Sequence, residues 1–177
     1  MADGIVARRI GLVTGANRGI GLAICRQLAS NGVTVLLGAR DAAAGEQAAA
    51  ALRAEGLDIQ SIRIDTADPQ SFESARDFLA HKFGHLDILV NNIGMGFDWG
   101  HTAADVPMRL LRETFEINFF SLVDLTQRLL PLIRLSHAGR IVNPSSAIGS
   151  LARRADQAAW SEGDWPLAYS DSKTALN

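Results

Sequence analysis

A tyrosine and a lysine near the end of the chain could together deliver a proton. Tyr169 is the only tyrosine of the chain, and Lys173, four residues later, is one of its two lysines. If this segment is helical, residues four apart lie on one face, so the phenol and the ammonium can act as a pair. A cation beside a phenol favours its ionised form, which suits a group that exchanges a proton with a carbonyl oxygen. The pair is suggestive by itself, and its interpretation depends on motifs elsewhere in the chain.

The second chemical signal is a glycine-rich turn near the N-terminus, Thr14-Gly15-x-x-x-Gly19-x-Gly21. Glycines are needed where the backbone turns sharply and approaches a pyrophosphate without Cβ atoms in the way. The N–H groups and the positive dipole end of the following helix would then face the anion. A tight strand–helix turn without a ligand could also use these glycines. Their position after the first strand of an alternating pattern favours nucleotide binding.

The residues after the second predicted strand indicate which dinucleotide would bind. An NAD site uses an acidic residue near the ribose 2′-hydroxyl, whereas an NADP site uses a cation for the 2′-phosphate. Here the strand ends with uncharged Ala39, followed by Arg40 and Asp41, and Arg18 lies inside the glycine turn. Two arginines can hold a phosphate through forked, charge-assisted hydrogen bonds. The alternative is that Arg40 is a solvated strand-end residue and Asp41 a helix N-cap. The pattern favours NADP(H).

The elements that would position these residues alternate between short apolar runs and longer helical patterns, which is typical of a parallel α/β sheet. Strands are predicted at 10–13, 33–39, 61–64, 87–91 and 140–143. Helices are predicted at 19–30, 41–54 and 69–83, from about 107 with a kink or break at Pro131, and from about 166 through Tyr169 and Lys173. Asp68 followed by Pro69 is a strong start signal, since aspartate is a good N-cap and proline suits the first helical position.

The pattern describes a single domain, residues 1–177, without internal repeats or a second-domain boundary. Five strands are one short of the common six-stranded dinucleotide fold. The last helix also lacks the strand into which it should lead. We therefore expect the sequence to contain most of a domain that is incomplete at its C-terminus.

Composition excludes several other classes of protein. The 177 residues are 47% hydrophobic and 20% charged, with a formal net charge of −2, which indicates a globular chain and favours neither a nucleic-acid nor a membrane partner. The single Cys25 permits no disulfide within the chain and is expected to be a small buried helix residue. His81 and His85 are separated by Gly84 and have no third ligand nearby, so no metal site is predicted. No signal peptide is recognisable, and we expect a cytoplasmic protein.

The ordered motifs resemble those of the short-chain dehydrogenase/reductase family, in the branch with a TGxxxGIG turn, over nearly the whole chain. Beside the turn, they are Asp65, Asn91-Asn92-Ile93-Gly94, Asn118 in Glu116-Ile117-Asn118-Phe119, Ser145-Ser146, and the Tyr169–Lys173 pair. The sequence departs from the family pattern at Ile93, where alanine is usual, and at Pro144, where proline removes a donor just before the serines. The resemblance implies a Rossmann-type, doubly wound parallel sheet whose C-terminal strands are missing from this chain.

The resemblance also implies a role for each motif. Tyr169 would give the proton, Lys173 would favour the phenolate and bind the nicotinamide ribose, Ser146 would hydrogen-bond the substrate oxygen, and Asn118 would hold a water that resupplies the proton. Asp65 would contact adenine. Together, the turn and the resemblance assign cofactor binding to Gly15, Asn17, Arg18, Gly19, Ile20, Gly21, Arg40, Asp65, Asn91, Gly94, Tyr169 and Lys173. Singly, the serines could merely end a strand, and Asn118 could be a satisfied polar residue in a helix.

Within the family, the chain is most similar to carbonyl reductases, through Gly-Ala-Arg-Asp at 38–41, the segment 129–133 and Trp165-Pro166 before the tyrosine. This likeness implies an NADPH-dependent oxidoreductase acting on a small ketone, aldehyde or quinone, or on the corresponding alcohol. The insert between Ser146 and Tyr169 weakly favours a monomer over a homo-oligomer. The alternative is a truncated, catalytically silent protein that binds a nucleotide or a partner. Trp99, Trp160 and Trp165 would either wall a substrate pocket or cover the core.

Overall fold

The computed structural model describes residues 8–155 and 166–177, so Trp160 and Trp165 lie outside the described residues. The chain divides into two compact units. The first contains residues up to Asn92 together with Gln127–Val142, and the second contains Ile93–Thr126 together with Asn143–Asn177.

The first unit is built on a five-stranded sheet with the order β3-β2-β1-β4-β5, in which every neighbouring pair is parallel. Its strands are β1 (Ile10–Val13), β2 (Thr34–Ala39), β3 (Ile59–Arg63), β4 (Ile88–Val90) and β5 (Arg140–Val142). The strand order reverses between β1 and β4, where Val13 pairs with Val90. This reversal is the switch point of a doubly wound sheet, beside which such folds bind their ligands. The predicted fold class is confirmed.

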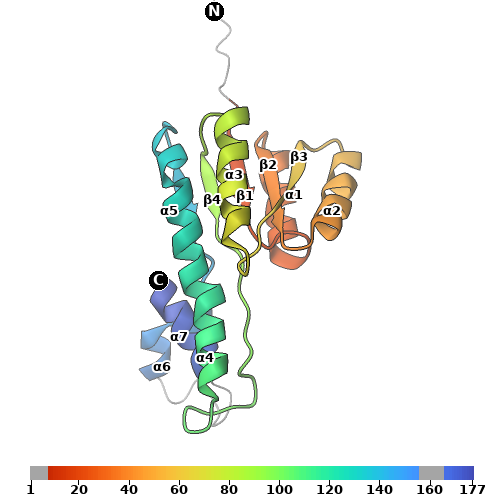
Figure 1. The fold of residues 1–177 in the computed structure, drawn as a ribbon. Coiled ribbons are helices and arrows are strands. Elements are labelled where there is room, and N and C mark those ends of the chain that lie inside the picture. The colour runs from red at the N-terminus through yellow and green to blue at the C-terminus, as the bar shows by residue number, and fades with distance from the viewer. Residues whose placement is uncertain (1–7, 156–165) are drawn as a thin grey trace, which may run out of the picture. The chain divides into compact units, whose positions relative to one another are not determined.

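The parallel strands of the sheet are joined by helical connections, for which a right-handed crossover is the rule. The helices of this unit are α1 (Gly19–Ser30), α2 (Ala42–Ala54), α3 (Pro69–Lys82) and the second half of α5 (Ser121–Arg134). Because the path β1-α1-β2-α2-β3 runs one way and the chain then returns to β4, α1 and α2 lie on one face and α3 on the other (Figure 1). Arg128 of α5 is ion-paired with Glu73 of α3, which joins these two helices.

Two aspartates set the starts of α2 and α3, as their positions in the sequence predict. The Asp41 carboxylate accepts a hydrogen bond from the Ala44 N–H at 3.0 Å. The Asp68 carboxylate accepts one from the Gln70 N–H at 3.2 Å, and Pro69 occupies the first turn, where a missing N–H costs nothing.

The core on the α1 and α2 face is formed by apolar side chains from β1, β2, both helices and the start of β3. Cys25 is fully buried in this core, and burial raises the pKa of its thiol to about 12. It is therefore the small packing residue that the sequence predicts rather than a reactive thiol.

The second unit is largely helical. It contains α4 (Met108–Phe115), a π-helical turn (Glu116–Phe120), the first half of α5, a 3₁₀ turn (Ala147–Gly149), α6 (Leu151–Ala155) and α7 (Leu167–Leu176). The helix starting near residue 107 is irregular at the π turn around Asn118, and the break that the sequence allowed at Pro131 does not occur. Pro131 lies inside α5, which continues to Arg134. It is exposed, so the carbonyl that loses its usual N–H partner can turn to water.

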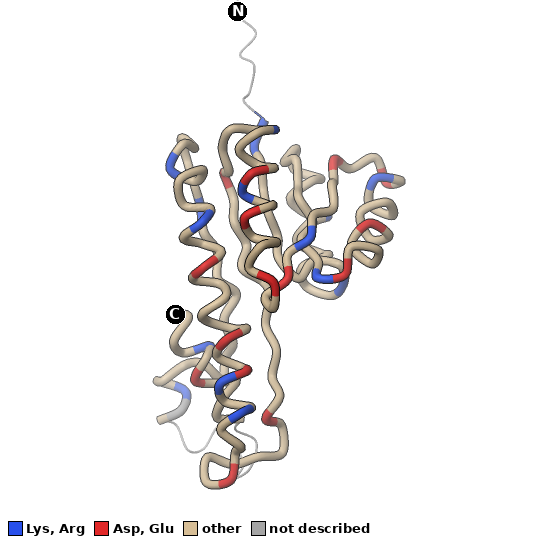
Figure 2. The backbone as a smooth tube through the Cα atoms, in the orientation of Figure 1, with Lys and Arg blue, Asp and Glu red and all other residues tan. Residues whose placement is uncertain are grey.

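Charged side chains are mixed along the described backbone. Acidic and basic residues are interspersed along the described backbone (Figure 2). Within the described residues, no helix is both long enough and apolar enough to cross a bilayer.

We predict that the sheet of the first unit is sensitive to truncation of β2. Leu36 is fully buried in this strand, so Leu36→Ala should lower the free energy of unfolding by about 2–5 kcal/mol in urea denaturation. Leu135→Ala is the matched control, because Leu135 is 66% exposed and its truncation should change that free energy by less than about 0.5 kcal/mol. Equal effects of the two substitutions would contradict this description of the core.

Candidate active site

The glycine turn follows β1 in the first unit, and its three glycines are required for different reasons. Gly15 and Gly19 have φ angles of 61° and 60°, a region that side chains with a Cβ rarely adopt. At Gly21, a Cβ would lie 2.8 Å from both the Ala16 Cα and the Gly15 carbonyl oxygen. Gly15 and Gly19 are therefore required by their backbone conformation, and Gly21 by the lack of space for a side chain.

Side-chain and backbone bonds hold this turn against its neighbouring strands. The Asn92 Nδ2 donates to the carbonyl oxygens of Thr14 and Gly15, at 3.0 and 3.2 Å. The Ala16 N–H donates to the Gly38 carbonyl at 2.8 Å, and the Thr14 N–H to the Val90 carbonyl at 3.0 Å. The turn is thus fixed from β2 and β4 without a ligand.

The start of α1 has the features of an anion site. Arg18 occupies the N-cap position and is exposed, and the first turn of α1 contains no acidic residue. Ile20, in that turn, is 72% exposed, and Asn17 is half-buried. The positive end of the helix dipole is therefore not compensated by a carboxylate of this turn, which suits the approach of a phosphate group.

Arg40 is exposed immediately after β2, and the neighbouring carboxylate serves another purpose. Asp41 caps α2 through the Ala44 N–H, so its carboxylate is already used by the helix. Asp41 is thus the N-cap that the sequence alternative describes, and Arg40 is solvent-exposed. The solvent exposure of Arg40 is compatible both with a solvated strand-end residue and with a contact to a phosphate group.

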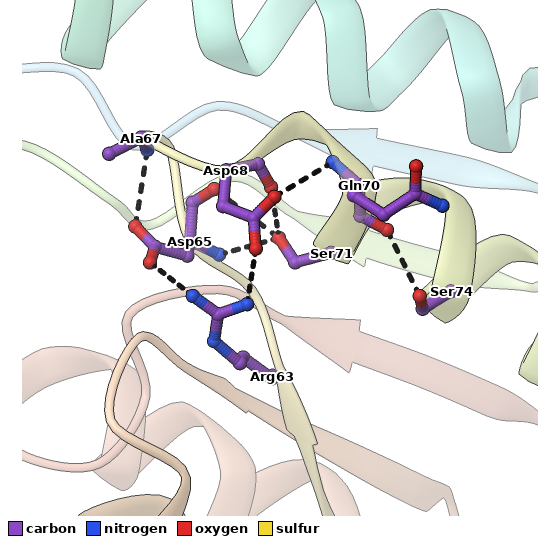
Figure 3. Close-up of polar contacts among 7 residues, drawn as sticks. All are labelled: Arg63, Asp65, Ala67, Asp68, Gln70, Ser71 and Ser74. Atoms are coloured by element: carbon purple, nitrogen blue, oxygen red, sulfur yellow. Dashed lines mark hydrogen bonds and ion pairs between the residues drawn. The ribbon is translucent and has the colours of Figure 1, made fainter.

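Asp65, just beyond β3, is held in a local network (Figure 3). Arg63 donates to the Asp65 carboxylate at 2.6 Å and to Asp68, and the Ala67 N–H donates to Asp65 Oδ1 at 3.1 Å. Ser71 Oγ accepts from the Asp65 N–H at 3.0 Å. The hydrogen bond from Arg63 keeps the pKa of the exposed Asp68 carboxyl below its usual value. Asp65 is therefore fixed both in backbone and in side chain.

In the second unit, Tyr169 and Lys173 lie on one face of α7, as their spacing predicts. The Lys173 Nζ lies 6.0 Å from the centroid of the Tyr169 ring. Lys173 is only 4% exposed, and its Nζ donates to the Pro144 carbonyl oxygen at 3.1 Å. At Gly94, a Cβ would lie 3.1 Å from this Nζ, so the glycine leaves the room that the ammonium occupies.

Asn118 lies in the π turn and connects α7 to the segment after Gly94. Its Oδ1 accepts from the Met95 N–H at 2.7 Å, while its Nδ2 donates to the Met95 carbonyl at 2.8 Å and to Ser172 Oγ at 2.9 Å. Ser172 Oγ in turn donates to the Tyr169 carbonyl at 2.8 Å. Both amide hydrogens of Asn118 are therefore used within the protein. Any water that Asn118 held would have to bind to its oxygen atoms.

The two serines precede the 3₁₀ turn, which packs against α7. Ser145 Oγ donates to the Lys173 carbonyl at 3.5 Å, and Ser146, half-buried, occupies the N-cap position of the turn. Thr174 Oγ1 donates to the Gly149 carbonyl at 2.9 Å, which joins the turn to the helix. Pro144 removes no ladder bond, because β5 has already ended at Val142.

Comparison with known proteins agrees with this arrangement of motifs. The family model described as short chain dehydrogenase matches residues 9–177. The chain belongs to the short-chain dehydrogenase family.

Relatives of this short-chain dehydrogenase are found among plant and animal enzymes. It is 38% identical to (+)-neomenthol dehydrogenase of Arabidopsis thaliana, over 88% of this chain and 58% of that protein. It is 44% identical to carbonyl reductase [NADPH] 1 of Homo sapiens, over 82% of this chain and 50% of that protein. The chain thus spans about half the length of the curated relatives it matches.

Solved structures show the same fold. The menthone neomenthol reductase of Mentha piperita is matched with a TM-score of 0.80 and 30% identity, over 96% of this chain and 82% of that chain. The Pseudomonas aeruginosa RhlG/NADP active-site complex is matched with a TM-score of 0.79 and 34% identity, over 97% of this chain and 64% of that chain.

Several residues that organise the two candidate sites of this short-chain dehydrogenase were not singled out by sequence reasoning. Asn92 was part of a recognised motif, but its bonds to the glycine turn depend on β1 and β4 being neighbours. Arg63 and Ser172 carry no sequence signal, because arginine at a strand end and serine in a helix are common on surfaces. Asp98 is fully buried, and only its tertiary contacts reveal a role.

The electrostatics of Lys173 give a testable consequence for stability. Desolvation by burial keeps the pKa of its ammonium below the usual value of 10.5. Between the lowered folded value and 10.5, the unfolded chain binds more protons than the folded chain. The contribution of Lys173 to the free energy of unfolding therefore rises as pH increases through this window, and below it the buried charge opposes folding.

We predict that Lys173→Met makes the protein more resistant to unfolding at neutral pH. The gain in melting temperature should shrink as the pH approaches 10.5, where the wild-type lysine loses its charge in both states. The exposed Lys82 provides the control, since Lys82→Met should keep the wild-type pH dependence. A melting temperature of Lys173→Met that stays below that of the wild type from pH 7 to 10 would contradict the desolvation argument.

Proposed function

We propose that this chain provides the hydride-transfer machinery of an oxidoreductase that reduces a small carbonyl compound, a ketone, aldehyde or quinone, with NADPH. The observation that carries the proposal is the arrangement around α7. The Tyr169 phenol and a buried Lys173 ammonium share one helix face, and the Ser145-Ser146 segment packs beside them. These groups can hold and deliver a proton to a developing alkoxide.

In this proposal, Tyr169 donates its hydroxyl proton to the substrate oxygen and Lys173 stabilises the resulting phenolate. Ser146 donates a hydrogen bond to the same oxygen as negative charge develops on it. Asn118 keeps α7 and the Met95 backbone in register through its three hydrogen bonds, and its oxygen atoms remain the candidates for holding a water. The bound nicotinamide supplies the hydride, which no side chain can provide.

NADP(H) is the proposed cofactor. The glycine turn and the start of α1 would hold the pyrophosphate, and the exposed side chains of Arg18 and Arg40 the 2′-phosphate. The remaining proposed contacts are Asn17, Ile20, Asp65, Asn91 and Gly94, with Tyr169 and Lys173 at the nicotinamide ribose. The human relative is named for its use of NADPH. A monomeric state and a cytoplasmic location remain predictions.

A nucleotide-binding or interaction protein without turnover is the second candidate. The chain spans about half the length of its curated relatives, and the activity of the whole protein is a proposal. NADPH oxidation with a quinone or an aromatic aldehyde separates the two candidates. Tight binding of NADPH without any turnover would favour the second.

Tyr169→Phe should lower the kcat for NADPH oxidation by about 10²–10⁴-fold, because the general acid is lost while the ring remains. The dissociation constant for NADPH, measured by quenching of its fluorescence, should stay close to that of the wild type. Normal turnover by Tyr169→Phe would overturn the assignment of the general acid.

Arg40→Ala should raise the KM for NADPH by about tenfold or more, because one charge-assisted bond to the 2′-phosphate is lost, and should leave the KM for NADH unchanged. Arg76→Ala is the matched control, since Arg76 is a half-buried arginine on α3 whose guanidinium is paired with Asp77. Equal changes for both cofactors would show that Arg40 does not read the 2′-phosphate.

A further inference from the structure

Asp98 lies in the second unit, in the loop that follows β4 and precedes α4, and its carboxylate is fully buried. It belongs to none of the sequence motifs and has no role in the proposed chemistry. Both of its oxygens face the start of α7. The Ala168 N–H donates to Oδ2 at 2.6 Å, and the Tyr169 N–H donates to Oδ1 at 3.4 Å. A side chain some 70 residues earlier in the sequence thus contacts the backbone of the tyrosine itself.

The helix needs this contact because it has no cap of its own. Pro166 occupies the N-cap position of α7 and has neither a side-chain oxygen nor an N–H. An ordinary N-cap residue accepts hydrogen bonds from the N–H groups of the second and third helical residues, which here are Ala168 and Tyr169. Asp98 therefore takes the place of the missing cap, and its negative charge also lies at the positive end of the helix dipole.

The loop that contains Asp98 also contacts the phenol ring. Trp99 packs against Tyr169 with 5.8 Å between ring centroids and 36° between ring planes. At Gly96, a Cβ would lie 3.2 Å from the Tyr169 Cδ2 and 2.9 Å from the Trp99 Nε1. This short segment thus touches both the backbone and the side chain of Tyr169.

The same loop is fixed at its other end. Asn118 binds the N–H and the carbonyl of Met95, three residues before Asp98. The segment from Met95 to Trp99 is therefore tied to the π turn at one end and to α7 at the other. A change at Asp98 would release the end that faces Tyr169.

We propose that Asp98 is a positioning residue for Tyr169: its carboxylate caps α7 from a separate loop and, together with Trp99, fixes the place of the phenol. This inference rests on the proposed role of Tyr169 as the general acid. Because both carboxylate oxygens accept from backbone N–H groups, Asp98 acts through Tyr169 and exchanges no proton with the substrate.

The test compares variants of Asp98 in the full chain. Asp98→Ala removes the cap, whereas Asp98→Asn keeps the acceptor for the Ala168 N–H, and asparagine caps about as well as aspartate. Asp105→Ala is the matched control, because Asp105 lies in the same loop region, is exposed, and accepts from the N–H and the hydroxyl of Thr102 rather than from α7.

We expect Asp98→Ala to lower kcat by about 10- to 100-fold through misplacement of the phenol, with little change in the KM for NADPH. Asp98→Asn should stay within about threefold of the wild type, since its cap is retained, and Asp105→Ala should match the wild type. A wild-type kcat in folded Asp98→Ala would overturn the proposal.

A second variant tests whether capping of α7 explains the effect, and it keeps the test valid if Asp98→Ala folds poorly. Combining Asp98→Ala with Pro166→Ser introduces a hydroxyl at the N-cap position, which should restore both folding and kcat. If the double variant folds but its kcat remains low, the cap does not explain the role of Asp98.

Because Tyr169 is the only tyrosine, its ring signals can be followed by NMR without measuring activity. The role of Asp98 can therefore be tested separately from the proposed function. In NMR spectra, the nuclear Overhauser contacts between the Tyr169 ring and the Trp99 indole should weaken in Asp98→Ala and persist in Asp98→Asn. Amide exchange at Ala168 should accelerate only in the alanine variant, because Asp98→Asn keeps one oxygen acceptor. If the wild type shows no turnover, the proposed function fails, while these spectra still decide whether Asp98 positions the ring. Unchanged contacts and exchange in Asp98→Ala would overturn the proposal.

Discussion

The second unit depends on a buried charge, the ammonium of Lys173. The charge of a lysine that is 4% exposed opposes folding, and the hydrogen bond to the Pro144 carbonyl offsets only part of this cost. Its surroundings are correspondingly restricted. Gly94 leaves room beside Nζ, and at Gly149 a Cβ would lie 2.8 Å from the Lys173 Cβ. The loop that contains Gly94 and the segment from Ser145 to Gly149 therefore pack against α7.

Under the proposed function, this arrangement keeps a charged group for chemistry at some expense of stability. Burial makes the charged form of Lys173 unfavourable, yet a cation beside a phenol is what proton transfer to a carbonyl requires. The first unit shows the same principle in the backbone, where Gly15 and Gly19 adopt left-handed conformations and Asn92 ties the turn to its neighbours. In both units, side chains from distant segments, Asn92 and Asp98, hold the reactive or binding elements in place.

Much of the fold could be predicted because its signals are local. The alternating pattern predicted the parallel sheet, and Asp41 and Asp68 marked the starts of two helices correctly. The errors have physical causes. A proline predicts a kink or a break at Pro131, but its exposed position lets α5 continue without a break, and the π turn at Asn118 is an irregularity that the sequence does not predict. The 3₁₀ turn and α6 were not predicted, because five or fewer residues give too little periodicity to recognise.

The sequence by itself determined the chemistry that is available: a tyrosine and a lysine four residues apart, a glycine turn after the first strand, and serines after the last. These are properties of residue type and spacing, which local geometry converts directly into shared faces and tight turns. Only the tertiary structure decided what supports them. The bonds of Asn92 to the glycine turn, of Arg63 to Asp65, and of Asp98 to the start of α7 join residues on different elements. Spacing along the chain cannot predict such bonds, because they depend on which strands and loops the fold makes neighbours.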